Sequence, residues 1–531
     1  MFCDKDKADE IQRLFAGNRA KKYRNNGKEL MLVQVLRVPV MLTRATCGTI
    51  LGRKFEGLKA KKERGIRMDR AKDKRALFET VPVPRALLTM AVPTIISQLI
   101  TLIYNIADTF FIGRANNPYM VAASSLVLTV FLMVGALANL FGVGGGSLMV
   151  RLLGSQEEEE ARKVASWTLV MAAFASLGFS LLCLIFMDPL LRLLGASDLT
   201  IGYARHYLIF VVVIGGIANV LSTTMSFLLR NAGYAREAAF GLSMGGVLNI
   251  ALDPVFMFLI LPDGYQVRGA GIATMLSSVA SLVYFLYQYR RVKSDSVLKV
   301  PRRVEKIRPA SRQNIFSIGV PAALSVFLFD LTNIVINRLS ASHGDLELAA
   351  IGIVQKVERL PLNIGIGICL GMIPLIGYNY ASGNMKRMQA FFTAARVSGL
   401  IVAALSVVSY YVLADRLIGL FIQDAQTVRL GTDFLRARCF ATPFMFLSFN
   451  MVNYMQAVDR GRESFYLAAI RQIALNIPLL FLLNHFFGMT GIVWTQATAD
   501  IINVIISYLV YARVLREIRE IMKVKAKPQA S

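Results

Sequence analysis

Histidine and cysteine are scarce in this sequence of 531 residues, which holds 3 His, 5 Cys and 2 Trp. The histidines (His206, His343 and His485) are scattered, and the cysteines show no spacing typical of a metal site. A membrane-embedded enzyme would need a metal cluster or a nucleophile with its base. We therefore expect a protein that is not an enzyme, with no catalytic residue, no cofactor and no structural metal.

The chain also lacks a nucleotide-binding signature. The run Gly142–Ser147 superficially resembles a phosphate-binding loop, but no strand precedes it and no Lys follows it. Its glycines are better suited to close packing between helices. No other stretch reads as a nucleotide-binding domain, which argues against a pump driven directly by ATP.

Charge is sparse and unevenly placed. Only 18% of the residues are charged, and the formal net charge is +25. Residues 1–75 contain 21 Lys and Arg against 9 Asp and Glu, so nearly half of the excess lies before the first apolar run. We therefore expect no nucleic-acid partner. The N-terminal stretch is either a basic arm on anionic lipid or a dispensable, disordered extension; we favour the second, because Met68 would make a natural start.

Apolar residues dominate the rest of the chain. With 55% hydrophobic residues and a mean hydropathy of +0.52, it is too apolar for a soluble domain of this size. Repeated apolar runs of about 20 residues are long enough to cross a bilayer. The sequence predicts an all-α polytopic membrane protein. Its twelve expected spans are 86–113, 119–150, 162–186, 204–229, 237–261, 269–289, 315–340, 347–378, 391–414, 431–456, 464–486 and 490–512.

Basic loops set the expected orientation of these spans. Lys and Arg gather in the loops on one side, above all in the linker Arg290–Arg312, so both termini should be cytoplasmic. The linker separates two sets of six spans. The expected segments are a basic N-terminal extension (1–83), a first lobe (84–290), a cytoplasmic linker (291–314), a second lobe (315–515) and a basic tail (516–531).

The two sets of spans read as copies of each other. The matching features, 226 to 228 residues apart, are Ala91–Pro93 with Gly319–Pro321, Asn105 with Asn333, Gly144 with Gly371, Arg236–Glu237 with Arg462–Glu463, and Asn249 with Asn476. Because each set has an even number of spans, the copies share one orientation across the membrane. Two lobes related in this way can rock about a central cavity, which suits alternating access.

Two acidic residues lie inside the expected spans of the first lobe. A carboxylate in lipid costs at least about 2.5–3.5 kcal/mol, so Asp108 and Asp253 require an explanation. At about 1.5 Å per residue, both lie in the outer half of the bilayer, and Thr274 reaches a similar depth. Asn249 lies one helical turn before Asp253. The set suits a hard monovalent cation, or the two acids could share a proton, because burial and like charge favour a neutral carboxyl.

Structural roles are the alternative for the same acids. Asp108 could reach the headgroups at the end of its helix. Asp253 could satisfy a kink at Pro254, which lacks a backbone donor.

Three further charged residues lie in the expected spans of the second lobe. Glu358 is expected to line the cavity or to pair with Lys356, and Asp500 is a candidate for the cavity wall. Arg471 lies near the end of its span and is expected to snorkel to the interface.

From about Pro84 to Leu515 the sequence resembles the multidrug and toxic compound extrusion (MATE) family of antiporters, of the bacterial type. The resemblance rests on Tyr104–Asp108 with Phe111–Gly113, on Asn249 with Asp253, and on Gly269–Thr274. It implies two six-helix lobes that exchange inward-moving Na⁺ or H⁺ for outward-moving cationic amphipathic drugs. It also implies a monomer surrounded by the lipids of the bacterial plasma (inner) membrane.

The resemblance also implies site residues. In members with a cation site in the first lobe, the ligands match Asp108, Asn249, Asp253 and Thr274, with Tyr104 close by. Another branch of the family places an acid early in the seventh span, and Asp330 lies one residue out of step with that position. The candidate substrate-cavity residues are thus Asp330, Glu358 and Asp500.

The second function that we consider is a flippase for a lipid-linked glycan precursor, built on a related lobe plan. Such a protein would keep a strongly cationic central cavity for the pyrophosphate, whereas the expected spans carry few interior Lys or Arg. A receptor explains neither the repeat nor the buried acids. We therefore favour a drug exporter with Na⁺ or H⁺ as the coupling ion.

Overall fold

The structure is a computed structural model that describes residues 75–115, 117–292, 297–298 and 306–526. The side chains of Asp330 and of residues 523–526 lie outside that description. The chain divides into two compact units, Met1–Asp69 and Arg70–Ser531. The first unit lies wholly outside the described residues, as do parts of the predicted linker and tail.

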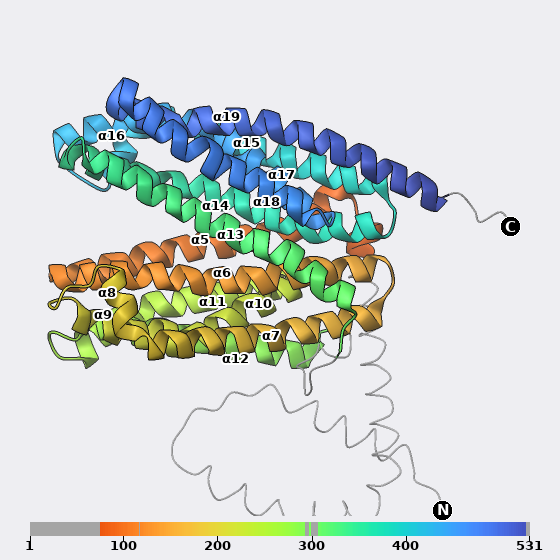
Figure 1. Ribbon diagram of the computed structural model, residues 1–531, viewed down its shortest axis with the longest axis horizontal. Helices are drawn as coiled ribbons and strands as arrows, with labels where there is room; N and C mark the ends of the chain where they lie inside the picture. Colours follow the sequence, from red (N-terminus) through yellow and green to blue (C-terminus); the bar gives the residue numbers. More distant parts are fainter. Residues whose placement is uncertain (1–74, 116, 293–296, 299–305, 527–531) are drawn as a thin grey trace, which may run out of the picture. The chain divides into compact units, whose positions relative to one another are not determined.

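The second unit is helical almost throughout, and its described residues contain no β-strand (Figure 1). The elements before the linker are called the N-lobe here. They are α5 (Val83–Arg114), α6 (Pro118–Gly154), α7 (Glu158–Ile185), α8 (Met187–Leu193), α9 (Ile201–Leu208), the π-helix η1 (Ile209–Ile214), α10 (Gly215–Asn231), α11 (Ala235–Pro254), the π-helix η2 (Val255–Ile260) and α12 (Gln266–Val292).

The elements after the linker are called the C-lobe. They are α13 (Pro309–Ala341), α14 (Asp345–Ala381), α15 (Met385–Gly419), α16 (Ala425–Arg438), the 3₁₀-helix η3 (Cys439–Ala441), α17 (Thr442–Ala457), α18 (Gly461–Ala469), the π-helix η4 (Ile470–Asn476) and α19 (Ile477–Ala526).

These elements make twelve membrane-spanning segments. Ten helical stretches of the described chain are long and apolar enough to cross a membrane. The last of them, Gly461–Met522, counts as two spans, because the backbone at Gly488 (φ 57°) is not helical. The succession α16–η3–α17 supplies the remaining span as shorter pieces. The predicted all-α fold with twelve spans in two lobes is confirmed.

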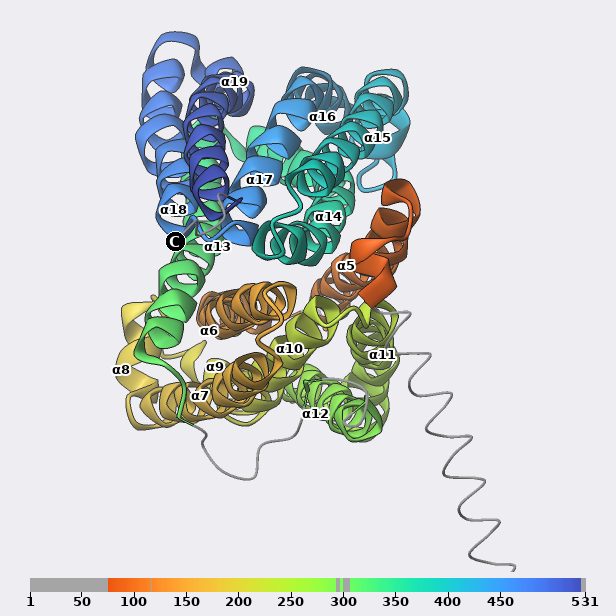
Figure 2. The same ribbon diagram turned by 90° about the vertical axis from the view of Figure 1, so that its right-hand side faces the viewer.

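Each lobe has a hydrophobic core of its own at the end of the helices that lies away from the α12–α13 linker. We call the end that carries the α12–α13 linker the linker end, and the opposite end the far end. One hydrophobic cluster, around Val127 and Leu208, draws all its buried members from the N-lobe. Another, around Ile336 and Leu480, draws all of its buried members from the C-lobe. Figure 2 shows α5 and α6 of the N-lobe facing α13 and α14 of the C-lobe.

The lobes are joined toward the linker end. One cluster there packs Met90 and Ala91 of α5 with Met372 of α14, and a smaller one packs Val143 of α6 with Ile318 of α13. The shared cores at this end and the separate cores at the other indicate that the lobes close on each other at the linker end.

Glycines allow the helix backbones to approach there. A Cβ atom added to Gly144 of α6 would lie 2.3 Å from the carbonyl oxygen of Ile315 in α13, and one added to Gly319 would lie 2.1 Å from that of Leu140. Because lipid supplies no hydrophobic drive between helices, such small residues matter by permitting van der Waals contact. The predicted packing role of Gly142–Ser147 is confirmed.

The predicted disorder of the N-terminal extension does not hold for residues 75–82. A helical turn precedes α5, and Phe78 is buried in the cluster between the lobes. Arg387 of α15 gives the physical reason: its guanidinium donates to the backbone carbonyls of Phe78 (2.6 Å) and Val81. A charged donor that satisfies free carbonyls at a helix end holds this segment on the C-lobe.

We expect Gly144→Ala to weaken the contact between the lobes. The added methyl group has no room against the α13 backbone, and overpacking of this kind typically costs about 1–3 kcal/mol. The measurement is the apparent melting temperature in detergent. Gly135→Ala is the matched control on the same helix, since a Cβ atom there meets nothing within 4 Å. Equal melting temperatures for the two variants would contradict the packing role of Gly144.

Candidate functional site

Helix α5 carries the first carboxylate of the site. Asp108 lies toward the far end of α5, and its Oδ2 accepts a hydrogen bond from the hydroxyl of Tyr207 at 3.3 Å. Tyr207 lies on α9 and is buried. Tyr104, one turn before Asp108, interacts with it electrostatically.

Helices α11 and α12 supply the other predicted residues. Asp253 is fully buried and Asn249 is 3% exposed. The side-chain amide of Asn249 lies 3.3 Å from Asp253 Oδ1 and 3.3 Å from Thr274 Oγ1, and donates to both. Both bonds lie beyond the common range for N–H···O contacts, so the amide holds its partners loosely.

The two groups of residues form one site. Asp253 interacts electrostatically with Asp108, and Tyr207 interacts with both carboxylates. The structure therefore brings together all five residues predicted for the cation site (Tyr104, Asp108, Asn249, Asp253 and Thr274). Their role as cation ligands stays a prediction.

Sequence reasoning missed Tyr207. A depth count could have found it, because Tyr207 comes a few residues into a span that enters from the same side as the span of Thr274. A tyrosine at the level of two buried acids is a candidate donor to them.

Three oxygen atoms of the site have no hydrogen-bond donor in the part of the chain that the structure describes. Within the described residues, Asp108 Oδ1, Asn249 Oδ1 and Asp253 Oδ2 are buried and accept no hydrogen bond. Buried acceptors in native proteins usually have a partner, and two carboxylates in one apolar site cannot both stay charged without compensation. The arrangement can hold a small cation among its oxygens or take up a proton on a carboxyl group.

Glycines on α11 and α12 let the helices of the site come together. A Cβ atom on Gly246 of α11 would lie 3.1 Å from the Tyr104 ring, and one on Gly271 of α12 would lie 3.3 Å from the Tyr207 ring. The Gly269–Thr274 stretch thus packs against the aromatic residues and carries Thr274 into the site. The predicted break at Pro254 is present, because α11 ends there and the π-helix η2 begins.

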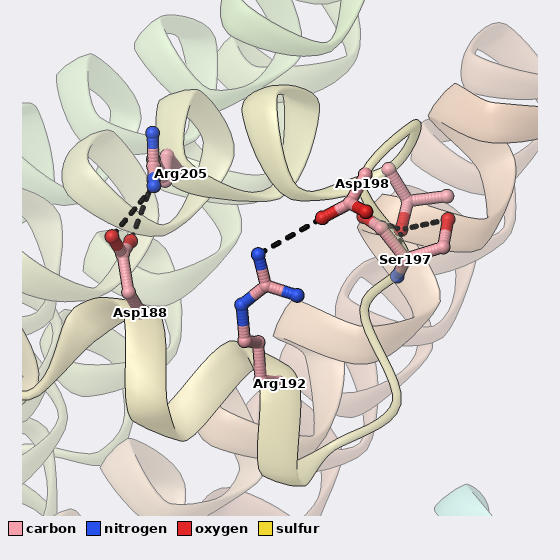
Figure 3. A network of polar contacts seen from close by, with 6 residues as sticks. Asp188, Arg192, Ser197, Asp198 and Arg205 are labelled. Carbon is pink, nitrogen blue, oxygen red and sulfur yellow. Dashed lines mark hydrogen bonds and ion pairs between the residues drawn. The ribbon is translucent and has the colours of Figure 1, made fainter.

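A polar network at the far end fixes the helix that carries Tyr207. Asp188 of α8 accepts two hydrogen bonds of 2.6 Å from Arg205 of α9, which lies two residues before Tyr207 (Figure 3). Beside it, Arg192 donates to Asp198 at 2.9 Å. The bidentate pair orients α9, although its exposure limits its contribution to stability.

The two positions of the C-lobe that correspond to Asp108 and Asp253 carry no carboxylate. The repeat offsets of 228 and 227 residues place Ile336 at the position of Asp108 and Leu480 at that of Asp253. Both are buried members of the same hydrophobic cluster. Where the N-lobe has Asp108 and Asp253, these two C-lobe positions therefore have apolar packing.

Two candidate carboxylates of the C-lobe, Glu358 and Asp500, have arginine partners. Glu358 accepts hydrogen bonds from Arg438 of α16 at 2.9 to 3.1 Å, so its partner is Arg438 and not Lys356. The two residues line a pocket together with Asn333, Gln355 and Gln496.

Asp500 is also neutralised within the C-lobe. It is fully buried, and it accepts hydrogen bonds from Arg471 at 2.5 and 3.1 Å and from Gln496 at 2.6 Å. The expectation that Arg471 snorkels is wrong: its side chain is 5% exposed, because a carboxylate within the lobe attracts it more strongly than the interface. Asp330 falls among the side chains that are not described. The substrate role of Asp330, Glu358 and Asp500 stays a prediction.

The sequence matches the family model MatE twice, over residues 93–255 and 321–482. Each match lies within one lobe. Among curated proteins, the multidrug export protein MepA of Staphylococcus aureus (strain MSSA476) is 30% identical over 423 residues, which are 80% of this chain and 92% of MepA. The MepA protein of Staphylococcus haemolyticus (strain JCSC1435) is 30% identical over 436 residues, with 82% and 95% covered.

Solved structures share the fold. One, described as the outward-facing conformation of a multidrug resistance MATE family transporter of the MOP superfamily, has a TM-score of 0.79 at 21% identity, covering 84% of this chain and 98% of its own. A MATE structure in the straight conformation has a TM-score of 0.78 at 21% identity, covering 84% and 98%. With its two family matches and its two six-span lobes, the chain belongs to the MATE family of transporters.

Proposed function

We propose that this protein is a secondary active antiporter that exports cationic amphipathic compounds in exchange for Na⁺ or H⁺. The observation that carries the proposal is the group of buried acceptor oxygens on Asp108, Asn249 and Asp253. A cation or a proton would compensate these oxygens. The curated relatives are named multidrug export proteins, which supports the export of drugs as the transport function.

In this mechanism the charge of the two carboxylates sets the substrate affinity. While Asp108 and Asp253 are charged, the N-lobe favours the state that admits a cationic substrate from the cytoplasm. Entry of Na⁺ or H⁺ from outside compensates negative charge of the pair, changes the packing of α5 against α11 and lowers substrate affinity, so the substrate leaves outward. One charge moving through 100 mV is worth about 2.3 kcal/mol, and an electroneutral exchange would rely on the ion gradient alone.

We propose that the coupling ion binds in the N-lobe only. The buried pair Ile336 and Leu480 offers no oxygen ligand at the equivalent place in the C-lobe. The C-lobe carboxylates Glu358 and Asp500 already have arginine partners. The transport cycle would then couple one ion site to one substrate path.

The surroundings of the protein follow from the same proposal. We place the chain in the bacterial plasma membrane with the linker end in the cytoplasm, because the linker is the most basic loop. Its partners would be membrane lipids and small amphipathic substrates, without nucleic acid, and it would work as a monomer.

The flippase alternative would need unpaired cations facing a central cavity. Two buried C-lobe arginines, Arg438 and Arg471, have carboxylate partners. This pairing removes two of the cations that a carrier of pyrophosphate-linked glycans would need.

Ethidium efflux from proteoliposomes, with Na⁺ and pH gradients imposed separately, is the principal test. We expect one of the two gradients to accelerate efflux and the other to have little effect. Efflux that responds to neither gradient would reject the antiport mechanism.

We expect Asp108→Asn and Asp253→Asn each to abolish ion-driven efflux while the protein stays folded. An amide keeps the shape of the side chain but can be neither charged nor neutralised by the ion. Asp433→Asn, which removes an exposed carboxylate from α16, is the matched control and should transport normally. Full activity in either site variant would remove the basis of the proposed site.

We expect Tyr207→Phe to weaken coupling without abolishing it. The lost hydroxyl donates a hydrogen bond to Asp108. One such bond to a charged group, at the long distance observed, is worth about 1 kcal/mol, which corresponds to a roughly fivefold change in ion affinity. The ion concentration for half-maximal efflux measures this change. Tyr203→Phe is the control on the same helix, since no hydrogen bond joins Tyr203 to Asp108 in the described chain. Equal half-maximal concentrations would show that Tyr207 does not act on the ion site.

A further inference from the structure

A group of three polar side chains links the lobes at the linker end. Arg151 of α6, in the N-lobe, forms an ion pair with Asp459 of the α17–α18 turn, with 3.0 Å between Nη2 and Oδ1. The same Nη2 donates to the side-chain oxygen of Asn314 on α13. Asn314 in turn donates to Asp459 Oδ1 at 2.7 Å. We call Arg151, Asn314 and Asp459 the clasp.

The clasp has one member on the N-lobe and two on the C-lobe. The Arg151 side chain is 7% exposed, and its Nη1 also donates to the backbone carbonyl of Gln456 at 3.4 Å. A buried guanidinium needs such partners, because an unpaired charge out of water is costly. All of these partners belong to the C-lobe. Arg151 must therefore give them up in any state in which the lobes part at this end.

The backbone of Asp459 is the second observation. Its φ is +66°, in the left-handed region that side chains other than glycine seldom adopt. In the N-lobe repeat, 226 residues earlier, the corresponding turn has Gly233 at a φ of +87°. The turn itself is therefore made with glycine in one lobe, and the C-lobe carries a carboxylate at a position where glycine would fit better.

The neighbouring charge works within its own lobe. Arg460, the next residue, pairs with Glu463 at 3.3 Å and with Glu517 at 2.9 Å, both in the C-lobe. These pairs attach the turn to α18 and α19 without any contribution from Asp459. Asp459 itself contacts Asn314 of its own lobe and Arg151 of the other lobe, so it joins the two at this end.

We propose that Arg151, Asn314 and Asp459 form a gate that holds the linker end closed and sets the balance between the two states of the transport cycle. The clasp forms in the state closed to the cytoplasm and opens when the linker end admits substrate. Its members act as positioning residues, because they control which state the lobes occupy without touching the ion site. The inference rests on the proposed alternating access of the lobes.

The test is the distance between the lobes in the full chain. Spin labels are attached at Arg291→Cys on α12 and Arg516→Cys on α19, which are exposed positions on different lobes near the linker end. Cys3 and Cys47 are replaced by Ser, while the buried Cys183, Cys369 and Cys439 are kept. Pulsed electron–electron double resonance in lipid nanodiscs then gives the ratio of long to short distances between the two spin labels, and it requires no transport.

We expect Asp459→Gly to raise this ratio about tenfold, because it removes the charge-assisted contacts but suits the left-handed turn. Asp459→Asn, which keeps an acceptor oxygen, should give a smaller rise and serves if the glycine variant does not fold. Gln156→Gly is the matched control: Gln156 also has a positive φ, of 64°, and is exposed. It should leave the ratio unchanged.

A separation profile in Asp459→Gly that equals the unmodified profile would overturn the gate. So would an equal rise in Gln156→Gly, because relief of backbone strain would then explain both. Lower thermal stability with unchanged separations would assign the clasp a structural role only, and would also overturn it. If ethidium efflux fails in the unmodified protein while Asp459→Gly still shifts the separations, the proposed substrate is wrong and the gate stands.

Discussion

The burial of charge in an apolar medium is the constraint on which the rest of this structure depends. Each lobe carries acidic residues within its membrane-spanning helices, and the two lobes treat them differently. The C-lobe gives Glu358 and Asp500 arginine partners, so these two charges are compensated within the protein. The N-lobe leaves one oxygen each of Asp108 and Asp253 without a donor among the residues that the structure describes. The same energetic cost is met by arginine partners in the C-lobe, whereas in the N-lobe it leaves acceptor oxygens without a donor among the described residues.

Much of the fold could be predicted because apolar runs and repeats leave a direct trace in the sequence. The depth count along the helices brought Asp108, Asn249, Asp253 and Thr274 to one level, and the structure places them together. The choice of partner in three dimensions could not be predicted. Arg471 was expected at the interface, and it turns to Asp500 from another helix. Proximity along the chain favoured Lys356 for Glu358, whereas α16 supplies Arg438.

The internal repeat gives the two lobes the same course of helices but different side chains at equivalent positions. Equivalent positions hold Asp108 and Ile336, or Gly233 and Asp459, on the same backbone plan. Each replacement changes the local chemistry without changing the course of the helices. The glycines at the crossing of α6 and α13 have a different task, because they bring two backbones together where no side chain would fit. The repeat thus accounts for the shared arrangement of helices, and the positions at which the two copies differ carry the candidate ion site and the clasp.

The short segment before α5 has a mechanical consequence. Residues 75–82 are fastened to the C-lobe through Arg387, yet they lead directly into α5 of the N-lobe. If the lobes rotate against each other, the chain around Pro82 has to act as a swivel, with the proline ring narrowing the torsions available to it. Residues 75–82 would then travel with the C-lobe, although the chain runs from them directly into the N-lobe.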